Sequence, residues 1–323
     1  MASAARSPRL LDKDELRALS RRRPLRAALA VARQWAVMAA AAAGAVAWGH
    51  WYGYVLAIVV IATRQHALAV LMHDGAHRSL FARRALNDLV SDLLLAFPLF
   101  ISTSLYRRHH LDHHRYLNTE RDPDLDTEAL AHTSRDWVRL FAGDVSGVNL
   151  LKTVDTLDQF SLLPVLRGDR TVARAMGRGR RNLFLAYLAA LAVVLTLTGG
   201  WLLYLLLWIL PSLTALSMIL RLRAAAEHVG CDPDGGIGGT RTVLAHPLER
   251  LLFSPCAINY HLAHHLYPTV PFYNLGLLHR KIMRSQEVRD RAHISRSYLF
   301  GRAGVLSHIA QARTAQARQD RAA

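Results

Sequence analysis

Residues 183–220 read LFLAYLAALAVVLTLTGGWLLYLLLWILPSLTALSMIL, a run of 38 residues without one Asp, Glu, Lys or Arg. A transmembrane helix needs ~20 apolar residues to cross ~30 Å of hydrocarbon. The run is therefore long enough for two such helices, and the pair Gly199-Gly200 divides it. We predict two membrane helices over residues 183–198 and 201–222, which fold back on each other at the glycines.

A second charge-free run covers residues 34–63. It is too short for two crossings unless both helices extend past the arginines at its ends. We therefore predict membrane helices over residues 28–48 and 51–72. Arg33 and Arg64 lie at similar distances from the turn between the helices, so we expect both side chains to snorkel towards one face of the membrane.

The charges indicate how the chain is oriented. The sequence has 40 Lys and Arg against 24 Asp and Glu, a formal net charge of +16, and neither hairpin has a basic residue near its turn. The rule that basic loops stay inside places this charge, both termini and the histidine motifs in the cytoplasm. We read the charge as an inner face next to anionic lipid, without nucleic-acid binding, because no basic-aromatic recognition module is present. The arginine- and alanine-rich composition suggests a bacterial inner membrane.

These patterns predict an all-α integral membrane protein. Four transmembrane helices form two hairpins, interfacial helices lie near residues 86–105 and 136–166, and a cytoplasmic helical cap completes the fold. We divide the chain into a basic N-terminal segment over residues 1–27, a membrane-embedded domain over residues 28–280 and a basic tail over residues 281–323. No sequence feature predicts an oligomeric state.

About half of the 17 histidines gather in three short windows on the predicted cytoplasmic side. Residues three or four apart share one face of a helix, so each window can direct two or three imidazoles to one point. The windows contain His73 and His77; His110, His113 and His114; and His261, His264 and His265, while His228 stands alone beyond the fourth helix. These nine are too many ligands for one metal ion and suit two. Imidazole binds iron, zinc or copper, so the ligand type leaves the metal open.

The three windows have the order H-x-x-x-H, H-x-x-H-H and H-x-x-H-H, which resembles the membrane-bound fatty acid desaturase superfamily of histidine-box desaturases and hydroxylases. The likeness covers roughly residues 50–280. It implies a non-haem di-iron centre with two iron ions (Fe²⁺/Fe³⁺) and O₂ as co-substrate. By this resemblance, the nine histidines above are the metal ligands, with His228 as the isolated additional one.

Further residues stand beside these ligands. We expect Glu227 to orient His228 or else to be a solvated helix end. Asn259 either holds a metal-bound water or has a turn or cap role. His109 is an alternative to His110 or a supporting neighbour. The carboxylates Asp122, Asp124 and Asp126 are read as a cap and turn in preference to ligands. Arg107, Arg108 and Arg115 are read as ordinary surface charge, with a lipid headgroup or an acidic electron donor as the alternative partner.

The resemblance implies an enzyme of lipid metabolism, most simply a fatty acyl or acyl-lipid desaturase that inserts a double bond. A hydroxylase or ketolase of a lipid or carotenoid would use the same site. A membrane zinc hydrolase is disfavoured because the H-E-x-x-H signature is absent, and a metal transporter because its sites lie near the bilayer midplane. The substrate is a membrane lipid or another long apolar molecule. The sequence has no fused electron-transfer motif, so we expect a separate electron donor such as a ferredoxin with its reductase.

Overall fold

The computed structural model of the chain describes residues 10–124, 134–149, 160–233 and 235–322. The chain divides into two compact units. We call residues 23–110 and 142–219 the hairpin unit, and residues 1–22, 111–141 and 220–323, which include both ends of the chain, the terminal unit. Three helices have residues in both units: α5 (Thr103–Tyr116), α6 (Ser134–Ser146) and α13 (Ala215–His228).

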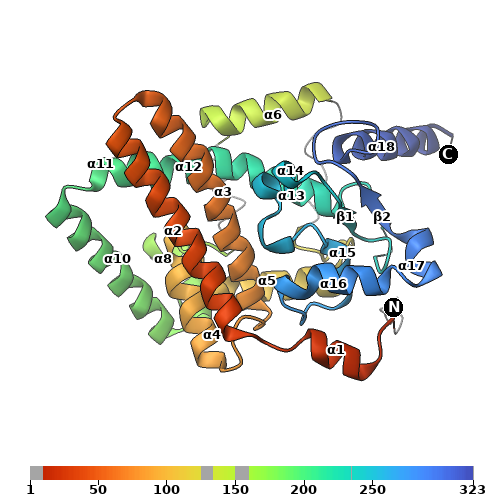
Figure 1. Ribbon diagram of the computed structural model, residues 1–323, viewed down its shortest axis with the longest axis horizontal. Coiled ribbons are helices and arrows are strands. Elements are labelled where there is room, and N and C mark those ends of the chain that lie inside the picture. Colours follow the sequence, from red (N-terminus) through yellow and green to blue (C-terminus); the bar gives the residue numbers. More distant parts are fainter. Residues whose placement is uncertain (1–9, 125–133, 150–159, 234, 323) are drawn as a thin grey trace. The chain divides into compact units, whose positions relative to one another are not determined.

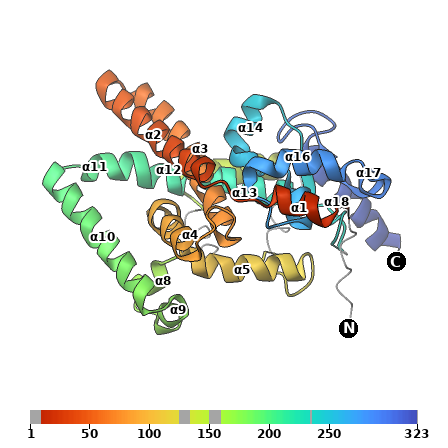
Figure 2. The same cartoon turned by 60° about the horizontal axis from the view of Figure 1, so that its bottom comes forward.

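Four long apolar helical stretches form most of the hairpin unit. They are α2 (Pro24–Trp48), α3 (Trp51–Ala76), α10 (Arg178–Thr198) and the stretch Trp201–His228, whose last turns belong to the terminal unit. Each is long and apolar enough to cross a membrane, and within the described ranges only these four meet both conditions. Figure 1 and Figure 2 show α2 and α3 side by side as an antiparallel hairpin. The predicted all-α membrane fold is thus confirmed.

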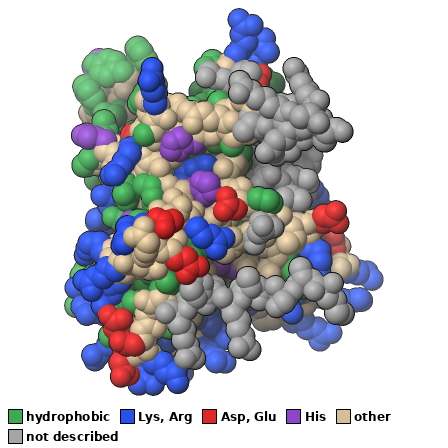
Figure 3. Space-filling model, turned by 90° about the vertical axis from the view of Figure 1, so that its right-hand side faces the viewer, with side chains coloured by type: hydrophobic (Ala, Val, Ile, Leu, Met, Phe, Trp, Pro, Cys, Tyr) green, Lys and Arg blue, Asp and Glu red, His purple; other side chains and the backbone are tan. Residues whose placement is uncertain are grey.

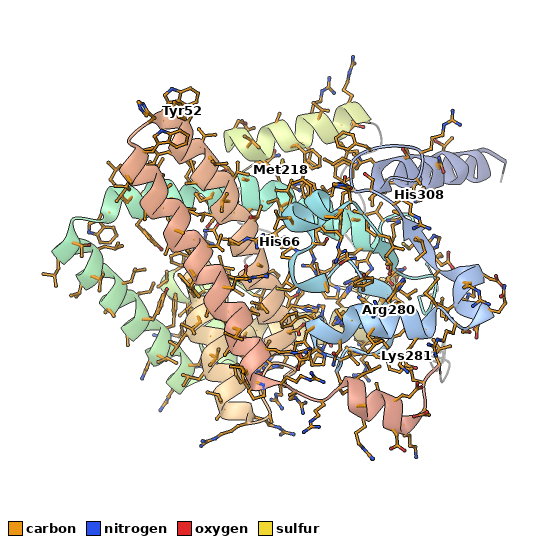
Figure 4. The ribbon with its side chains drawn as sticks, viewed as in Figure 1. Tyr52, His66, Met218, Arg280, Lys281 and His308 are labelled. Atoms are coloured by element: carbon orange, nitrogen blue, oxygen red, sulfur yellow. The ribbon has the colours of Figure 1, made fainter. Side chains whose placement is uncertain are left out.

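The predicted helices match best at their turns. The first turn lies between Trp48 and Trp51 and the second between Thr198 and Trp201. Figure 4 places Tyr52 at the turn of the first hairpin, as expected for an interfacial aromatic residue. The opposite ends extend beyond the predicted limits, because a helix continues its hydrogen bonding into the polar region beyond the hydrocarbon. At the start of α2, for example, Pro24 occupies the first helical position, where its missing N–H costs nothing.

The fourth stretch is interrupted in its middle. It consists of α11 (Trp201–Tyr204), the π-helix η4 (Leu205–Ile209), α12 (Leu210–Leu213) and α13. Pro211 lacks a backbone donor, and Thr214 has non-helical angles of φ −120° and ψ −90°. Trp208 lies in η4, and its carbonyl accepts a hydrogen bond from Gln65 Nε2 of α3 at 2.8 Å. A side chain of the neighbouring helix therefore satisfies a backbone group at the interruption.

Helix α3 lies at the centre of the hairpin unit. In its most apolar window 67% of the residues are buried, against 11% in α10. It packs against α2, η4 and α12. The expected snorkelling of Arg64 is wrong: this side chain is buried and donates a hydrogen bond to Gln34 Oε1 of α2 at 3.2 Å. Burial on the central helix keeps the guanidinium inside, where a polar partner satisfies it.

Residues 86–105, where we predict an interfacial helix, contain no helix long and apolar enough to span a membrane. Helix α4 (Arg84–Ser91) runs into a π-helical turn, η1 (Asp92–Ala96), and a 3₁₀ turn, η2 (Phe97–Leu99). Phe100 then adopts a left-handed conformation with φ 57°, and α5 begins three residues later. These short pieces pack against α3 through α4 and η1. The break at Pro98 and Phe100 therefore prevents one long helix.

The remaining helices of the hairpin unit are short. Helix α6 covers most of the first half of the predicted interfacial stretch 136–166, whereas residues 150–159 lie outside the described ranges. Helices α8 (Leu163–Leu166) and α9 (Arg170–Met176) lead into α10. Buried Phe97, Leu162 and Phe184 form a small core around this entry.

The terminal unit is a packing of short helices with one small sheet. Its elements besides α5, α6 and α13 are α1 (Lys13–Leu19), β1 (Arg241–Val243), α14 (Pro247–Phe253), η5 (Pro255–Ala257), α15 (His261–Leu266), α16 (Phe272–Ile282), α17 (Gln286–Arg291), β2 (His293–Ser295) and α18 (Val305–Ala322). The two strands are parallel, with Arg241 opposite His293. Leu262 of α15 and Leu278 of α16 are fully buried in its core. The predicted tail from residue 281 is thus largely helical, and the predicted three-part division of the chain stays a prediction.

Candidate metal centre

The hairpin unit brings together three of the predicted ligands. His73 lies in the last turn of α3, His77 caps that helix, and His110 lies on α5. The ring of His110 is 4.4 Å from that of His73 and 4.9 Å from that of His77, centroid to centroid. The rings of His73 and His77 are 5.0 Å apart. We call these three residues the hairpin set.

A network of hydrogen bonds holds the end of α3 that carries this set. Arg107 donates to the carbonyl oxygens of Ala76 and Gly75 at 2.7 and 3.0 Å, and it pairs with Asp88 at 2.6 Å. Asn87 Nδ2 also donates to the Gly75 carbonyl, at 2.9 Å. The guanidinium therefore caps the helix at its negative end, where a cation is favourable. The sequence predicts that Arg107 is ordinary surface charge. The structure instead gives this side chain a structural role at the end of α3.

The structure separates His109 from His110. His110 is buried and contacts both other members of the hairpin set. The ring of His109 packs against the ring of Phe160, with 5.2 Å between their centroids. Adjacent residues on a helix point about 100° apart, so only one of the two can face the set. The geometry favours His110.

The terminal unit brings together a second group. Ligand nitrogens of four histidines, one from α5, one from α13 and two from α15, lie within 4.8 Å of one another. They are His113, His228, His261 and His265, which we call the terminal set. His113 and His261 are buried, with 2% and 1% of their surface exposed. His114 and His264 form a further pair in this unit, with their Nε2 atoms 3.0 Å apart.

The distances in the terminal set suit a metal ion. The Nε2 atoms of His228 and His261 are 3.0 Å apart. Two nitrogens bound to one ion at ~2.1 Å, at the angles of octahedral or tetrahedral coordination, are about 3 to 3.5 Å apart. The separation is also that of a hydrogen bond between two rings. What distinguishes this site is that four imidazoles converge, since a hydrogen bond needs only two.

Asp122 supports one member of the terminal set. Its Oδ1 lies 2.8 Å from His113 Nδ1, and Asp124 Oδ2 lies 3.5 Å from the same nitrogen. Burial tends to raise the pKa of Asp122, but the hydrogen bond and charge of His113, with two backbone N–H donors, hold it below its ordinary value. With Nδ1 held by a carboxylate, Nε2 is the ring nitrogen left for a metal.

The role of Asp122 was missed in the sequence. The sequence predicts a turn here, and Asp122 does accept backbone N–H groups from Asn118 and Asp124 at 2.9 Å each. The contact with His113, nine positions earlier, is additional. The run Asp122-Pro123-Asp124 follows the second histidine window closely, which indicates that a carboxylate lies near these rings. The spacing alone does not predict which ring the carboxylate contacts. Asp126 lies outside the described residues.

Burial keeps some of these imidazoles neutral. Burial lowers the pKa of His265 well below its ordinary value, and the neighbouring histidines add to the shift. Burial, together with the charge of Arg107, lowers the pKa of His77 to about 4. Only neutral imidazole binds a metal ion, so both side chains are in the required form at neutral pH.

Glu227 differs from expectation, whereas Asn259 has a contact that belongs to one of its two expected roles. Glu227 is buried, which excludes a solvated helix end, and its Oε1 pairs with Arg223 at 2.8 Å. The carboxylate lies 3.5 Å from Nδ1 of His261, so it accompanies that ring instead of His228. Asn259 Nδ2 donates to the carbonyl of Val243 in β1 at 3.0 Å, which is a structural role. Its buried Oδ1 has no hydrogen-bond partner among the described residues.

The histidines outside the windows have other surroundings. His66, which Figure 4 shows midway along α3, and His279 of α16 are buried. His293 pairs with Asp232 at 2.9 Å, and His308 with Ser295 at 2.8 Å. His132 lies outside the described residues. Among the described residues, the groups of side chains that could hold a metal ion include none of these histidines.

Comparison with known proteins supports the same conclusion as the geometry. Residues 49–297 match the family model described as fatty acid desaturase. The chain is also 30% identical, over 268 residues, to the dihydrorhizobitoxine desaturase of Bradyrhizobium elkanii. That alignment covers 78% of this chain and 73% of the relative. The matched region contains the eight histidines of the three windows and also His228, all nine proposed ligands.

Proposed function

Because this chain belongs to the fatty acid desaturase family, we propose that it is a membrane-bound di-iron desaturase that inserts a double bond into a long apolar chain. Membership itself assigns an oxidative enzyme of the desaturase or oxygenase type. The proposal adds the metal, the reaction and the substrate. The observation that carries it is the convergence of four imidazoles in the terminal set and three in the hairpin set.

We assign one metal ion to each set. His113, His228, His261 and His265 would hold one ion, and His73, His77 and His110 would hold the other. His114 and His264 complete the nine proposed ligands. Iron suits imidazole ligands, and such sites require neutral rings, which burial favours at His77 and His265. When bound, the two irons would supply the activation of O₂ that removal of hydrogen from an unactivated C–H bond requires.

The balance of the reaction defines the partners. Removing two hydrogen atoms from the substrate supplies two electrons and two protons, and reduction of O₂ to two waters needs four of each. A separate one-electron carrier must therefore supply two electrons, with two protons from solvent. We propose a ferredoxin with its reductase. Within the chain, Asp122 orients the His113 ring, and the burial of His73, His110, His113 and His261 limits their contact with bulk water.

The relative suggests a second substrate class. Its printed name assigns desaturation of dihydrorhizobitoxine to that protein. We take this name as support for desaturation over hydroxylation or ketolation. We also keep dihydrorhizobitoxine as a candidate substrate beside an acyl lipid.

The test is reconstitution with defined components. Purified protein is loaded with iron, supplied with reduced ferredoxin and O₂, and incubated with acyl lipids or with dihydrorhizobitoxine. Mass spectrometry should show a product that has lost two hydrogen atoms. A product that has gained one oxygen atom would identify a hydroxylase. Protein that holds only zinc and resists iron loading would contradict an oxidase of either kind.

Substitution of ligands provides the matched control. His113→Ala and His264→Ala should each abolish turnover and reduce the bound iron. His50→Ala changes an exposed histidine at the first turn and should leave both unchanged. A His113 or His264 variant that keeps full iron and full activity would be removed from the ligand set.

A further inference from the structure

We infer that Asn118 is a positioning residue that holds the supports of two proposed ligands, His113 and His228, at the same time. The inference rests on the proposed function in one respect only, namely that the terminal set binds a metal ion. All the residues involved lie in the terminal unit.

Asn118 makes three hydrogen bonds just after the end of α5. Its side-chain Nδ2 donates to the carbonyl of Asp232 at 2.8 Å and to the carbonyl of Gly239 at 3.2 Å. Its backbone N–H donates to Asp122 Oδ2 at 2.9 Å. One residue thus connects the loop over residues 232–239 with the carboxylate beside His113.

The first connection leads to His113. Asp122 accepts from Asn118 with one oxygen, while its other oxygen lies 2.8 Å from His113 Nδ1. The Asn118 backbone therefore fixes the rotation of the carboxylate that directs this ring. Groups that orient a metal-binding histidine in this way strengthen metal binding as well as geometry.

The second connection leads to His228. The Gly239 carbonyl, which accepts from Asn118 Nδ2, also lies 3.5 Å from His228 Nδ1. With Nδ1 facing this carbonyl, Nε2 of His228 points to His261 Nε2, 3.0 Å away. The position of the Gly239 carbonyl therefore decides which nitrogen of His228 faces the set.

The backbone at Gly238 and Gly239, beside this carbonyl, is closely packed. A Cβ at Gly239 would lie 2.5 Å from Gly235 Cα, and one at Gly238 would lie 1.8 Å from Asp232 Oδ2. The backbone N–H of Asp232 also donates to the Gly238 carbonyl at 2.8 Å. The Asn118 amide donates to the carbonyls of both Asp232 and Gly239. It therefore connects two backbone groups at a point where Gly235 and Gly239 approach closely.

Asparagine alone meets both requirements of the position. The backbone is left-handed, with φ 58°, a conformation that asparagine, aspartate and glycine tolerate better than other residues. Of these three, only asparagine has two side-chain N–H donors for two carbonyls. Aspartate would set a negative charge against the same two carbonyls, and glycine would leave them without these bonds.

The experiment compares Asn118→Asp and Asn118→Gly with the wild-type full-length protein. Both variants keep the left-handed backbone and its N–H, so both are expected to fold. Glu120→Gln is the control, because it exchanges an acid for an amide two positions away at an exposed site. Co²⁺ binding to the metal-free protein is measured by competition with a chelator and by the visible spectrum of the bound ion. Circular dichroism and the melting temperature report folding.

We expect both variants to bind one of two Co²⁺ ions about 10- to 100-fold more weakly, with a changed spectrum for that ion. The other ion, assigned to the hairpin set, and both ions of Glu120→Gln should bind as in the wild type. Folded variants with wild-type affinity and spectrum would overturn the inference, and so would two variants that fail to fold, because Asn118 would then be a requirement of the fold. Failure of the proposed function is distinguishable: the wild type would bind no Co²⁺ at the histidines, or would bind it and perform no oxidation with iron.

Discussion

Asp122 shows how one side chain combines two tasks. It closes the turn after α5 by accepting backbone N–H groups, and it holds the Nδ1 side of His113. Both it and His113 are buried, so few water molecules compete for the contact. A residue that looks like an ordinary turn former is thereby part of the proposed metal site.

Replacing Asp122 tests this double role. Asp122→Ala should weaken metal binding by the terminal set about 10- to 100-fold, because His113 loses the group that orients it. Asp122→Asn keeps the shape and should have a smaller effect. Chelator competition measures both. Asp112→Asn, an exposed position on α5, is the control, and equal affinity in Asp122→Ala and Asp112→Asn would show that the carboxylate is a turn former only.

His279 makes stability depend on pH. Burial, together with the charge of Arg280, lowers the pKa of this ring from its ordinary value of 6.5. Between the lowered pKa and 6.5 the unfolded chain binds more protons than the folded protein, so stability is lost as pH falls through that window and is fully present above it. His279→Phe keeps a ring against Tyr260 and removes the titrating group.

Melting temperatures measured between pH 8 and pH 5 test this expectation. With both proteins metal-free, the melting temperature of the wild type should fall further on acidification than that of His279→Phe. His50→Ala should follow the wild type, because His50 lies exposed at a turn. Parallel curves for the wild type and His279→Phe would assign the acid sensitivity to other groups.

At the scale of elements, α3 combines a membrane-spanning helix with a ligand-bearing end. Its central position follows from contacts with α2, η4 and α12, and its last turn is fixed by Arg107 and Asn87. Between the two histidines of that turn lies Gly75. A Cβ there would be 2.2 Å from Ser91 Oγ of α4, so α3 and α4 touch at this point.

Gly75→Ala therefore tests the close approach of these two helices. The added methyl group should force them apart and lower the stability by about 1 to 3 kcal/mol. It should also reduce metal binding by the hairpin set, because the same turn carries His73 and His77. Gly44→Ala in α2 is the matched control: no atom lies within 4 Å of its Cβ, and alanine favours a helix. Thermal unfolding in detergent measures the difference, and equal melting temperatures would contradict the tight contact.

Helix α5 shows what a helical spacing can predict. His110 and His114 are four positions apart, and His113 lies between them, so their joint exposure on one face follows from 3.6 residues per turn. The partners of each ring do not follow from the spacing. The structure places His110 against His73 and His77, His113 against Asp122, and His114 against His264.

For the whole molecule, the charge distribution predicts an orientation. Figure 3 shows one face on which Lys and Arg side chains are more prominent than Asp and Glu side chains. Four spans return both ends of the chain to one side, and the excess of arginine predicts that this side is the cytoplasm.

Reporter fusions test the orientation. A reporter that is active only outside the inner membrane should be active when inserted after Gly199 and inactive when fused to the C-terminus. The opposite pattern would reverse the orientation. Activity at both sites would contradict a membrane crossing by the stretch Trp201–His228.

Local patterns in the sequence predict the helices, the turns and the candidate ligands. A run without charge, a glycine pair and a repeat of histidines three and four apart are local properties, and each has a local physical consequence. The limits of the helices were less predictable, because hydrogen bonding continues beyond the hydrocarbon. The burial of Arg64 was not predictable, since it depends on Gln34 in another helix.

The groups that support the candidate ligands follow from contacts between separate elements. Asp122 serves His113, Glu227 lies beside His261 instead of His228, and Arg107 caps α3. The physical reason is that a hydrogen bond needs a distance of about 3 Å and a direction, which depend on how separate elements pack. Spacing along one helix predicts which side chains face the same way. It does not predict which groups of other elements these side chains contact.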